Sequence, residues 1–358
     1  MNEIPEADKS LADRLPFGVH GSAFLPAVNV ESYSLIFKEN GKFIGDRVNK
    51  AAFSSNLDTI RKTSRRRGHD DPFSVPSDEI RKSDLAEILK DGKPAAAEMV
   101  NAALDQFADD LFDVLQRYRK TKEWRRVQRI AVGGGFSDDR IGRLAVARVQ
   151  SRLHAENINC DLRPIDQDPN EAGLIGVAHL APSWIFANFD AIIAIDIGGT
   201  KMRCGALRLK FDKQSRITKV KALHSRIWRH VEDSPNRTQA IDELVSMIDK
   251  VIRKCRCEKI RLAPFIGIGC PGRIRPNGMI DRGAQNLPGK WEGDAFNLPA
   301  ILRDRLVVLK GHETVVLMHN DAVVQGLSQI PVMQDVQHWA ILTIGTGLGN
   351  AKFTNRDA

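Results

Sequence analysis

Three glycine-rich turns, each following an apolar run, carry residue types that bind polyphosphates. Residues 196–201 read DIGGTK, residues 344–349 read IGTGLG, and residues 133–135 are three glycines. Glycine lets backbone N–H groups approach a phosphate closely because no Cβ stands between them. A threonine in each of the first two turns and a lysine in the first add side-chain donors. One such turn would indicate little, but the three together predict a site for nucleotide phosphates.

Two aspartates are placed for phosphoryl-transfer chemistry. Asp196 ends an apolar run directly before the first turn, where a carboxylate can hold Mg²⁺ directly or through water. Asp321 ends the run TVVLMHND, and the carboxyl ends of buried strands commonly carry ligand groups. A carboxylate there can take the proton of a substrate hydroxyl that attacks phosphorus. The structural alternatives are a turn-forming aspartate at 196 and a helix N-cap at 321.

Composition describes a globular chain with room for two cores. The 358 residues are 42% hydrophobic and 27% charged, which excludes fibrous and largely disordered proteins. This length exceeds one compact core and suits two domains. No apolar stretch approaches the roughly 18 residues of a membrane span, and the N-terminus MNEIPEADKSLADR lacks the apolar core of a signal peptide. We therefore expect a cytoplasmic protein without a membrane partner.

Charge and cysteine usage narrow the partners further. The 53 Lys and Arg residues outnumber the 45 Asp and Glu residues, for a net charge of +8. The basic residues are dispersed in short runs, such as RKTSRRR and RYRKTKEWRR, which are typical of solvated surfaces. Nucleic acid is therefore not an expected partner. The five cysteines are odd in number and scattered, which argues against a disulfide framework and suits a reducing compartment.

Alternating strand and helix patterns must position the turns and the aspartates. Apolar runs predict buried strands within RRVQRIAVGGG (residues 125–135), AIIAIDIGGT (191–200), LAPFIGIGCPG (262–272) and TVVLMHND (314–321), and further strands at residues 204–211, 220–228 and 339–353. Helical periodicity over 85–115 breaks at Asp91-Gly92, and Asn40-Gly41 predicts a tight hairpin. The other residues up to 60 read as extended, and residues 61–83 read as loop. Strands alternating with helices predict an α/β fold.

Five motifs together resemble the ROK family of sugar kinases and related regulators. They are DIGGTK, GCPGRI, NLPGKW, NDA and IGTGLG, and the resemblance covers most of residues 85–355. DIGGTK alone occurs in several kinds of sugar kinase, whereas the combination is far more specific. The resemblance implies a two-lobed α/β protein of the actin/hexokinase-like (ribonuclease H-like) ATPase fold.

The order of the motifs along this chain differs from the usual family order. DIGGTK ordinarily lies near the N-terminus, whereas here the GGG turn and the segment DPNEAGLIGVAHL both precede it. The resemblance therefore implies a circular permutant, which is tolerable because domain termini often lie close together. We expect a larger lobe of residues 1–185 with 335–358, on the adenosine side. The smaller lobe, residues 186–334, is expected to hold the DIGGTK turn, the sugar side and the catalytic aspartate.

The resemblance also implies roles for individual residues. Asp321 matches the catalytic general base, and Asp196 is the expected Mg²⁺ residue. The residues expected on the sugar side are Asn320, Gly272, Arg273 and Asn286. The residues expected to bind the nucleotide are Gly198, Gly199, Thr200, Lys201, Gly345, Thr346 and Gly347, with Gly134 and Gly135 beside the adenosine.

Two family elements are missing from this chain. Neither the E-x-G-H element that contacts the sugar nor the cysteine-rich zinc motif after it has a match. Cys255 and Cys257 have the spacing C-x-C but no second cysteine pair, so no structural zinc is expected. His20 follows the IGTGLG hairpin in permuted order and is a candidate for the missing histidine. His319 adjoins the expected base and could tune its pKa or simply end the strand.

The leading hypothesis is an ATP- and Mg²⁺-dependent kinase that phosphorylates a hydroxyl of a hexose or N-acetylhexosamine. Phosphoryl transfer needs mainly alignment and charge neutralisation, so two phosphate turns, Mg²⁺ and one base suffice. The missing elements favour an alternative, a catalytically degenerate sugar-binding regulator, although residues 1–60 do not read as a DNA-binding helical trio. A third hypothesis is another ATPase of the same fold with a different acceptor. Related kinases are commonly dimers, so a homodimer is compatible with the resemblance.

Overall fold

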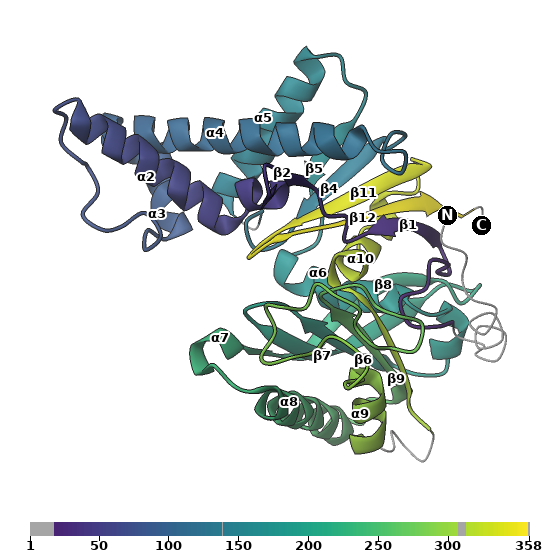
Figure 1. The fold of residues 1–358 in the computed structure, drawn as a ribbon. Helices are drawn as coiled ribbons and strands as arrows, with labels where there is room; N and C mark the ends of the chain where they lie inside the picture. Colours follow the sequence, from purple (N-terminus) through teal and green to yellow (C-terminus); the bar gives the residue numbers. More distant parts are fainter. Residues whose placement is uncertain (1–17, 138, 307–312, 357–358) are drawn as a thin grey trace. The chain divides into compact units, whose positions relative to one another are not determined.

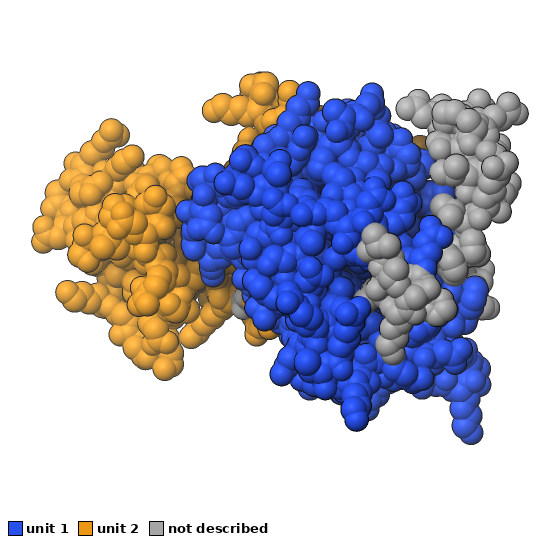
Figure 2. All heavy atoms as spheres, turned by 90° about the horizontal axis from the view of Figure 1, so that it is seen from below, with its two compact units in different colours: residues 1–34, 171–334, 353–358 blue, residues 35–170, 335–352 orange. Residues whose placement is uncertain are grey.

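The protein is an α/β chain with two mixed five-stranded sheets and two compact units; the first sheet lies in unit 1 and most of the second lies in unit 2. The structure is a computed structural model that describes residues 18–137, 139–306 and 313–356, with residue 169 described by its backbone alone. Unit 1 comprises residues 1–34, 171–334 and 353–358, and unit 2 comprises residues 35–170 and 335–352 (Figure 2).

Unit 1 is built on a sheet with the strand order β10-β9-β6-β7-β8 (Figure 1). Its strands are β6 (Ala191–Ile197), β7 (Met202–Phe211), β8 (Ile217–Trp228), β9 (Leu262–Cys270) and β10 (Val315–Asn320). β6, β7 and β8 pair antiparallel, whereas β6, β9 and β10 run parallel. The carboxyl ends of β6, β9 and β10 therefore lie at the same end of the sheet.

Residue size decides how closely helices approach the two faces of this sheet. On one face, branched side chains of β6 and β9 pack against α8 (Arg237–Cys257) and α9 (Leu298–Arg305). The opposite face of β9 carries Gly267 and Gly269, where a Cβ would lie 2.2 Å from Val177 and 3.3 Å from Val324, respectively. These glycines let η2 (Gly176–His179) and α10 (Asp321–Leu327) lie directly on the strand.

Short elements complete unit 1. They are α6 (Pro169–Ile175), η3 (Ser183–Phe186), α7 (His230–Asp233) and η4 (Ile330–Val332). Local sequence starts the long helix α8 as well: Asn236 and Gln239 form a capping box, in which each side chain accepts the other residue's backbone N–H.

Unit 2 is built on the second sheet, with the order β1-β12-β11-β4-β5. Its strands are β1 (Val28–Tyr33), β4 (Arg129–Gly133), β5 (Asp161–Pro164), β11 (His338–Ile344) and β12 (Leu348–Asn355). β11, β4 and β5 run parallel, and β12 follows β11 after a three-residue turn. The division between the units falls within β12, so that β1 and residues 353–355 are counted with unit 1.

Helices pack on the sheet of unit 2 around the apolar side of the long helix α4 (Pro94–Arg119). The helices that pack with α4 are α2 (Lys50–Arg66), α3 (Lys82–Asp91) and α5 (Arg140–Ala155) (Figure 1), together with the short helix η1 (Ile44–Val48). Proline at the first position of α4 fits because its missing N–H would have no partner there. In the described ranges, no helix combines the length and apolar character needed to cross a membrane.

The two sheets share one strand order. In each, a hairpin lies at the centre, formed by β6 and β7 or by β11 and β12. A third strand, β8 or β1, borders the second strand of the hairpin. A parallel strand, β9 or β4, borders the first, and a second parallel strand, β10 or β5, forms the edge beyond it. The chain therefore uses one α/β arrangement twice.

Sequence patterning located most elements, with one error. The hairpin at Asn40-Gly41 is confirmed by β2 (Lys38–Glu39) and β3 (Lys42–Phe43), and the break at Asp91-Gly92 separates α3 from α4. The expectation of extended chain up to residue 60 and loop over 61–83 is wrong, because α2 covers residues 50–66. Buried Arg61, held by Asp71 and Ser77, stands where the helical pattern calls for an apolar residue.

The expected lobe boundaries stay a prediction. The structure counts residues 171–185 with unit 1, where η2 packs on β6, β9 and α10. Residues up to 34 also belong to unit 1. One contact that holds them there is the hydrogen bond from the Gly21 N–H to the Met318 carbonyl oxygen at 2.9 Å.

Gly176→Ala should lower the free energy of unfolding by about 1–3 kcal/mol, because its Cβ would lie 1.7 Å from the carbonyl oxygen of Val324 in α10. Denaturant unfolding followed by circular dichroism measures the change. Glu171→Ala, an exposed substitution nearby, is the control and should change the free energy by less than about 0.5 kcal/mol. An unshifted midpoint for Gly176→Ala would contradict the close packing of η2 on α10.

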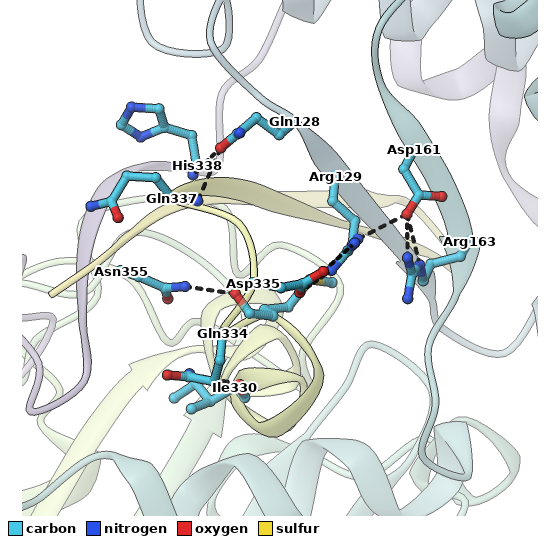
Figure 3. Close-up of polar contacts among 11 residues, drawn as sticks. Gln128, Arg129, Asp161, Arg163, Ile330, Gln334, Asp335, Gln337, His338 and Asn355 are labelled. Carbon is cyan, nitrogen blue, oxygen red and sulfur yellow. Dashed lines mark hydrogen bonds and ion pairs between the residues drawn. The ribbon is translucent and has the colours of Figure 1, made fainter. Parts of the chain in front are cut away.

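A buried arginine joins β4 and β5 to the start of the last segment of unit 2. Arg129 donates to Asp161 at 2.8 Å and to the two carboxylate oxygens of Asp335 at 2.5 and 2.8 Å (Figure 3). Its side chain is 11% exposed, whereas that of Asp335 is 66% exposed. The Arg129 guanidinium lowers the pKa of Asp335 to about 2.

Arg129→Met should therefore destabilise unit 2 by about 1–2 kcal/mol at pH 7, less than for a fully buried pair because the aspartates can be rehydrated. The depressed pKa of Asp335 makes its contribution present above about pH 4, and the contribution is lost as the pH falls towards 2. The gap between wild type and variant should shrink over that range in thermal melts. Arg126→Met, at an exposed position, is the control, and equal effects of both substitutions would refute a role for the ion pairs.

Candidate functional site

Asp196 lies on the sheet face that η2 and α10 cover. Antiparallel pairing places Arg203 of β7 directly opposite Asp196 of β6. Arg203 Nη1 donates to Asp196 Oδ2 at 2.5 Å, and the side chains are only 8% and 14% exposed. A Cβ on Gly173 of α6 would lie 2.6 Å from the carboxyl carbon of Asp196. The carboxylate is thus held between a strand arginine and the backbone of a helix.

The DIGGTK turn closes the hairpin between β6 and β7. The Gly198 N–H donates to the Lys201 carbonyl oxygen at 2.9 Å. Neither Gly198 nor Gly199 has a left-handed φ, so backbone conformation does not require glycine at either position. At Gly199, glycine is required because a side chain would lie too close to a neighbouring residue. A Cβ on Gly199 would lie 3.0 Å from the Cβ of Asn286, which places this expected sugar-side residue against the phosphate turn.

The start of α7 supports the same turn. His230, which is 3% exposed, lies with its Nε2 2.9 Å from the Gly198 carbonyl oxygen and donates to it. The Val231 N–H reaches the Thr200 carbonyl oxygen at 3.4 Å. The carbonyl oxygens of the turn thus have partners within unit 1.

Asn320 and Asp321 end β10 and begin α10. Asn320 caps the helix, because its Oδ1 accepts the N–H groups of Ala322 at 3.0 Å and Val323 at 3.3 Å. The cap role that was the structural alternative for Asp321 therefore belongs to its neighbour. Asp321 is the first residue of the helix and is half-buried as a whole residue, and burial of its carboxyl group is the main influence on its pKa.

Asp321 and Asp196 influence each other electrostatically. Burial and, after it, the negative charge of Asp196 raise the pKa of Asp321 from 3.8 to about 7, against hydrogen bonds that lower it. A carboxyl with a pKa near 7 suits a general base at neutral pH. Burial, followed by both carboxylates, raises the pKa of the Cys270 thiol well above its usual value, so this cysteine remains protonated.

Asn320 connects the expected base to the loop after β9. Its Nδ2 donates to the Gly272 carbonyl oxygen at 2.9 Å and to Ser34 Oγ at 3.2 Å. Gly272 has a φ of 100°, and a Cβ there would lie 2.6 Å from the Arg282 carbonyl oxygen, so the loop needs glycine at this point. Arg273, the next residue, is exposed.

The two histidines near the expected base hold backbone. His319 Nδ1 accepts the Asn320 N–H at 2.7 Å, and its Nε2 donates to the Ser22 carbonyl oxygen at 3.0 Å. His20 Nδ1 accepts the Met318 N–H at 3.1 Å. Burial lowers the pKa of both rings to about 4, so both are neutral at pH 7. These contacts give no support to His20 as the missing sugar-binding histidine.

In unit 2, the GGG and IGTGLG turns lie side by side at the ends of the parallel strands β4 and β11. Gly134 has a φ of 85°, and a Cβ there would lie 2.4 Å from the Ile344 carbonyl oxygen. The Gly345 N–H donates to the Gly347 carbonyl oxygen at 3.0 Å, and Thr346 at the tip of the turn is exposed. Close packing of the two turns therefore requires glycine at position 134.

Lys82, the first residue of α3, lies against the GGG turn. Its Nζ contacts the Gly135 carbonyl oxygen, lies 2.9 Å from the Asp139 carboxylate and stands 5.0 Å above the centre of the Phe136 ring. Asp139 also caps α5 by accepting the Gly142 N–H at 3.0 Å. The lysine thus places a positive charge beside the turn that is expected to meet adenosine.

The structure gathers the expected residues into two groups, one in each unit. The unit 1 group holds Asp196, Gly198, Gly199, Thr200, Lys201, Gly272, Arg273, Asn286, Asn320 and Asp321. The unit 2 group holds Gly134, Gly135, Gly345, Thr346 and Gly347. That both groups share one nucleotide and sugar site stays a prediction.

Sequence reasoning missed four neighbours of these residues: Gly173, Arg203, Ser34 and Lys82. Arg203 had a signal, because residues 196 and 203 are equidistant from the centre of the DIGGTK turn. Ser34 and Lys82 had none, since each reaches its site from a distant part of the chain.

The two carboxylates of unit 1 fit a divalent cation. A cation beside Asp196 would relieve the repulsion that raises the pKa of Asp321. The ion pair with Arg203 partly neutralises Asp196, which favours contact with Mg²⁺ through water. The described part of the chain contains no group of three or more His, Cys, Asp or Glu side chains arranged to hold a metal. Further ligands would therefore come from water and nucleotide phosphates.

Comparisons with known proteins give only partial structural likenesses. No family model and no curated protein matches the sequence. A protein of Listeria monocytogenes described as a candidate N-acetylmannosamine kinase is 24% identical, with a TM-score of 0.31 over 46% of this chain and 47% of that chain. An exopolyphosphatase of Cytophaga hutchinsonii is 16% identical, with a TM-score of 0.27 over 46% and 52% of the two chains.

The Ppx/GppA phosphatase of Aquifex aeolicus is 12% identical, with a TM-score of 0.25 over 52% of this chain and 56% of that chain. The chain thus spans about half the length of each of these three structures.

Asp321→Asn should stabilise the protein at pH 8 by on the order of 2 kcal/mol, because it removes a buried charge. The raised pKa means that folded protein holds the Asp321 proton more tightly than unfolded protein does. The resulting stability is fully present below about pH 4 and is lost as the pH rises towards 7. Thermal melts should show the variant's advantage growing between pH 4 and 7 and then levelling off. A constant difference over that range would contradict the burial of the Asp321 charge.

Proposed function

We propose that this protein is an ATP-dependent kinase of the actin/hexokinase-like ATPase fold that phosphorylates a sugar hydroxyl. One observation carries the proposal. Asp196 near the end of β6 and Asp321 directly after β10 lie at the same end of a sheet, on parallel strands that both pair with β9. Burial, followed by the charge of Asp196, raises the pKa of Asp321 to about 7. The acid and metal chemistry of phosphoryl transfer needs this pairing of a base with a cation-holding carboxylate.

Asp321 acts as the general base. Its carboxylate accepts the proton of the acceptor hydroxyl as the hydroxyl oxygen attacks the γ-phosphorus of ATP. Asn320 keeps the carboxylate at the end of β10, because its side chain caps α10 and also bonds the loop at Gly272. Bound Mg²⁺ would supply charge neutralisation at the phosphates, and Asp196 is the residue placed to hold it.

The strand order supports the fold and the circular permutation as parts of this proposal. Each unit has a central hairpin whose turn carries a phosphate motif, DIGGTK in unit 1 and IGTGLG in unit 2. If the strands of unit 1 are numbered along the chain from β6, they lie in the sheet in the order 3-2-1-4-5, which is expected for half of an actin/hexokinase-like ATPase. If the strands of the second sheet are numbered from β11 to β12 and then from β1 to β5, they lie in the same order.

The acceptor is proposed to be a hexose or N-acetylhexosamine. Neutral hydrogen-bonding groups lie next to Asp321 in the chain: Asn320 precedes it and contacts the Gly272 carbonyl oxygen and Ser34 Oγ. Asn286 lies against the DIGGTK turn. Amides and hydroxyls both donate and accept, as recognition of sugar hydroxyls requires. Arg273 is the exposed cation beside this group.

Wild-type protein with ATP, Mg²⁺ and a panel of glucose, N-acetylglucosamine and N-acetylmannosamine should release ADP in a coupled assay. Asp321→Asn should lower kcat by about 10²–10⁴, because the amide cannot accept the proton. The wild-type kcat/KM should rise with pH and level off above about 7, as Asp321 loses its proton. Asp70→Asn, at an exposed position in unit 2, is the matched control and should keep full activity.

Two outcomes would contradict the kinase. Sugar binding without ADP release would favour the degenerate sugar-binding protein instead. ADP release without dependence on any sugar would indicate an ATPase of the same fold with another acceptor.

A further inference from the structure

Several buried polar atoms in the described part of unit 1 lack a hydrogen-bond partner. Among them are Oε1 of Gln325 in α10 and, in β1, Oδ1 of Asn29 and Oγ of Ser32. The two elements pack against each other, and both belong to unit 1. Buried polar atoms are normally satisfied, so unsatisfied atoms on neighbouring elements indicate a missing polar partner.

Gln325 lies on the Asp321 side of α10. Residues four positions apart on a helix are neighbours, with Cβ atoms about 5–6 Å apart. The intervening Val323 and Val324 are fully buried, and Val324 lies over Gly269 of β9. Gln325 is itself 9% exposed. A long amide therefore occupies the helix face that begins with the expected base, where apolar neighbours would make an apolar side chain the ordinary choice.

The end of β1 reaches the same region. Ser34, one residue beyond β1, has a φ of 51° and accepts a hydrogen bond from Asn320 Nδ2 at 3.2 Å. A left-handed φ is uncommon for serine, and such residues gather at functional sites. β1 thus brings Ser32 and Ser34 towards the helix that carries Asp321 and Gln325.

The unsatisfied atom selects the kind of ligand. Oε1 is an acceptor, so its partner must donate a hydrogen bond. Phosphate oxygens at neutral pH cannot donate, whereas a sugar hydroxyl can.

We infer that Gln325 binds a second hydroxyl of the sugar, distinct from the one that Asp321 activates, with Ser32 lining the same place. This inference rests on the proposed function. Gln325 thereby selects among sugars, because a site built to bond a hydroxyl discriminates against the analogue that lacks it.

Gln325→Met tests the inference, since methionine keeps the length and volume of the side chain but loses its hydrogen bonds. Calorimetry measures the binding of glucose, N-acetylglucosamine, N-acetylmannosamine and their monodeoxy analogues to wild type and variant. We expect the variant to bind the preferred sugar about 10- to 100-fold more weakly. We also expect one deoxy analogue to bind wild type equally weakly and to lose nothing further in the variant. Gln214→Met, exposed in unit 1, is the control and should bind like wild type.

The readouts separate this inference from the proposed function. Equal sugar affinities and deoxy-sugar preferences in wild type and Gln325→Met, with only a shifted melting temperature, would overturn the inference and assign the amide to a buried water. ADP release tests only the proposed kinase activity. A wild type that binds sugar without releasing ADP would refute that activity. The comparison of sugar binding by wild type and Gln325→Met would still decide the role of Gln325. A wild type that binds no sugar of the panel would overturn both.

Discussion

Burial of the Asp321 carboxyl near the negative charge of Asp196 is the electrostatic constraint on which the site in unit 1 depends. Each of these two residues is held by a different device: Asp196 by an ion pair with Arg203, and Asp321 by its place at the start of a helix that Asn320 caps. Burial and, after it, the charge of Asp196 bring the Asp321 pKa to about 7. Such an arrangement costs stability when the site is charged, which is typical of groups retained for chemistry.

Glycines make this arrangement sterically feasible. Gly267 and Gly269 clear one face of β9 for η2 and α10, and Gly173 brings α6 against the Asp196 carboxylate. At Gly176, the backbone of η2 meets that of α10 so closely that even a methyl group would collide with a carbonyl oxygen. Helices therefore approach the sheet at backbone distance, and the charge of Asp196 in β6 comes near enough to raise the pKa of Asp321 in α10.

The second sheet repeats the order of the first, and the motifs occupy related places in it. DIGGTK and IGTGLG both close the central hairpin of their sheet. The GGG turn follows β4, the parallel neighbour of the hairpin strand β11, and lies against the IGTGLG turn. A glycine-rich turn placed there exposes backbone N–H groups without a Cβ in the way, which is the property that phosphate binding uses.

Sequence by itself determined the α/β class, the buried strands and the turns, because apolar periodicity and glycine spacing are local properties. It also singled out Asp196 and Asp321 by their places at strand ends. It misjudged α2, since buried Arg61 is satisfied by Asp71 and Ser77, partners that no helical pattern reveals. Tertiary structure alone decided the Asp321 pKa, the bond from Ser34 to Asn320 and the burial of Gln325. These depend on contacts between segments far apart in the chain, where burial and charge act through space.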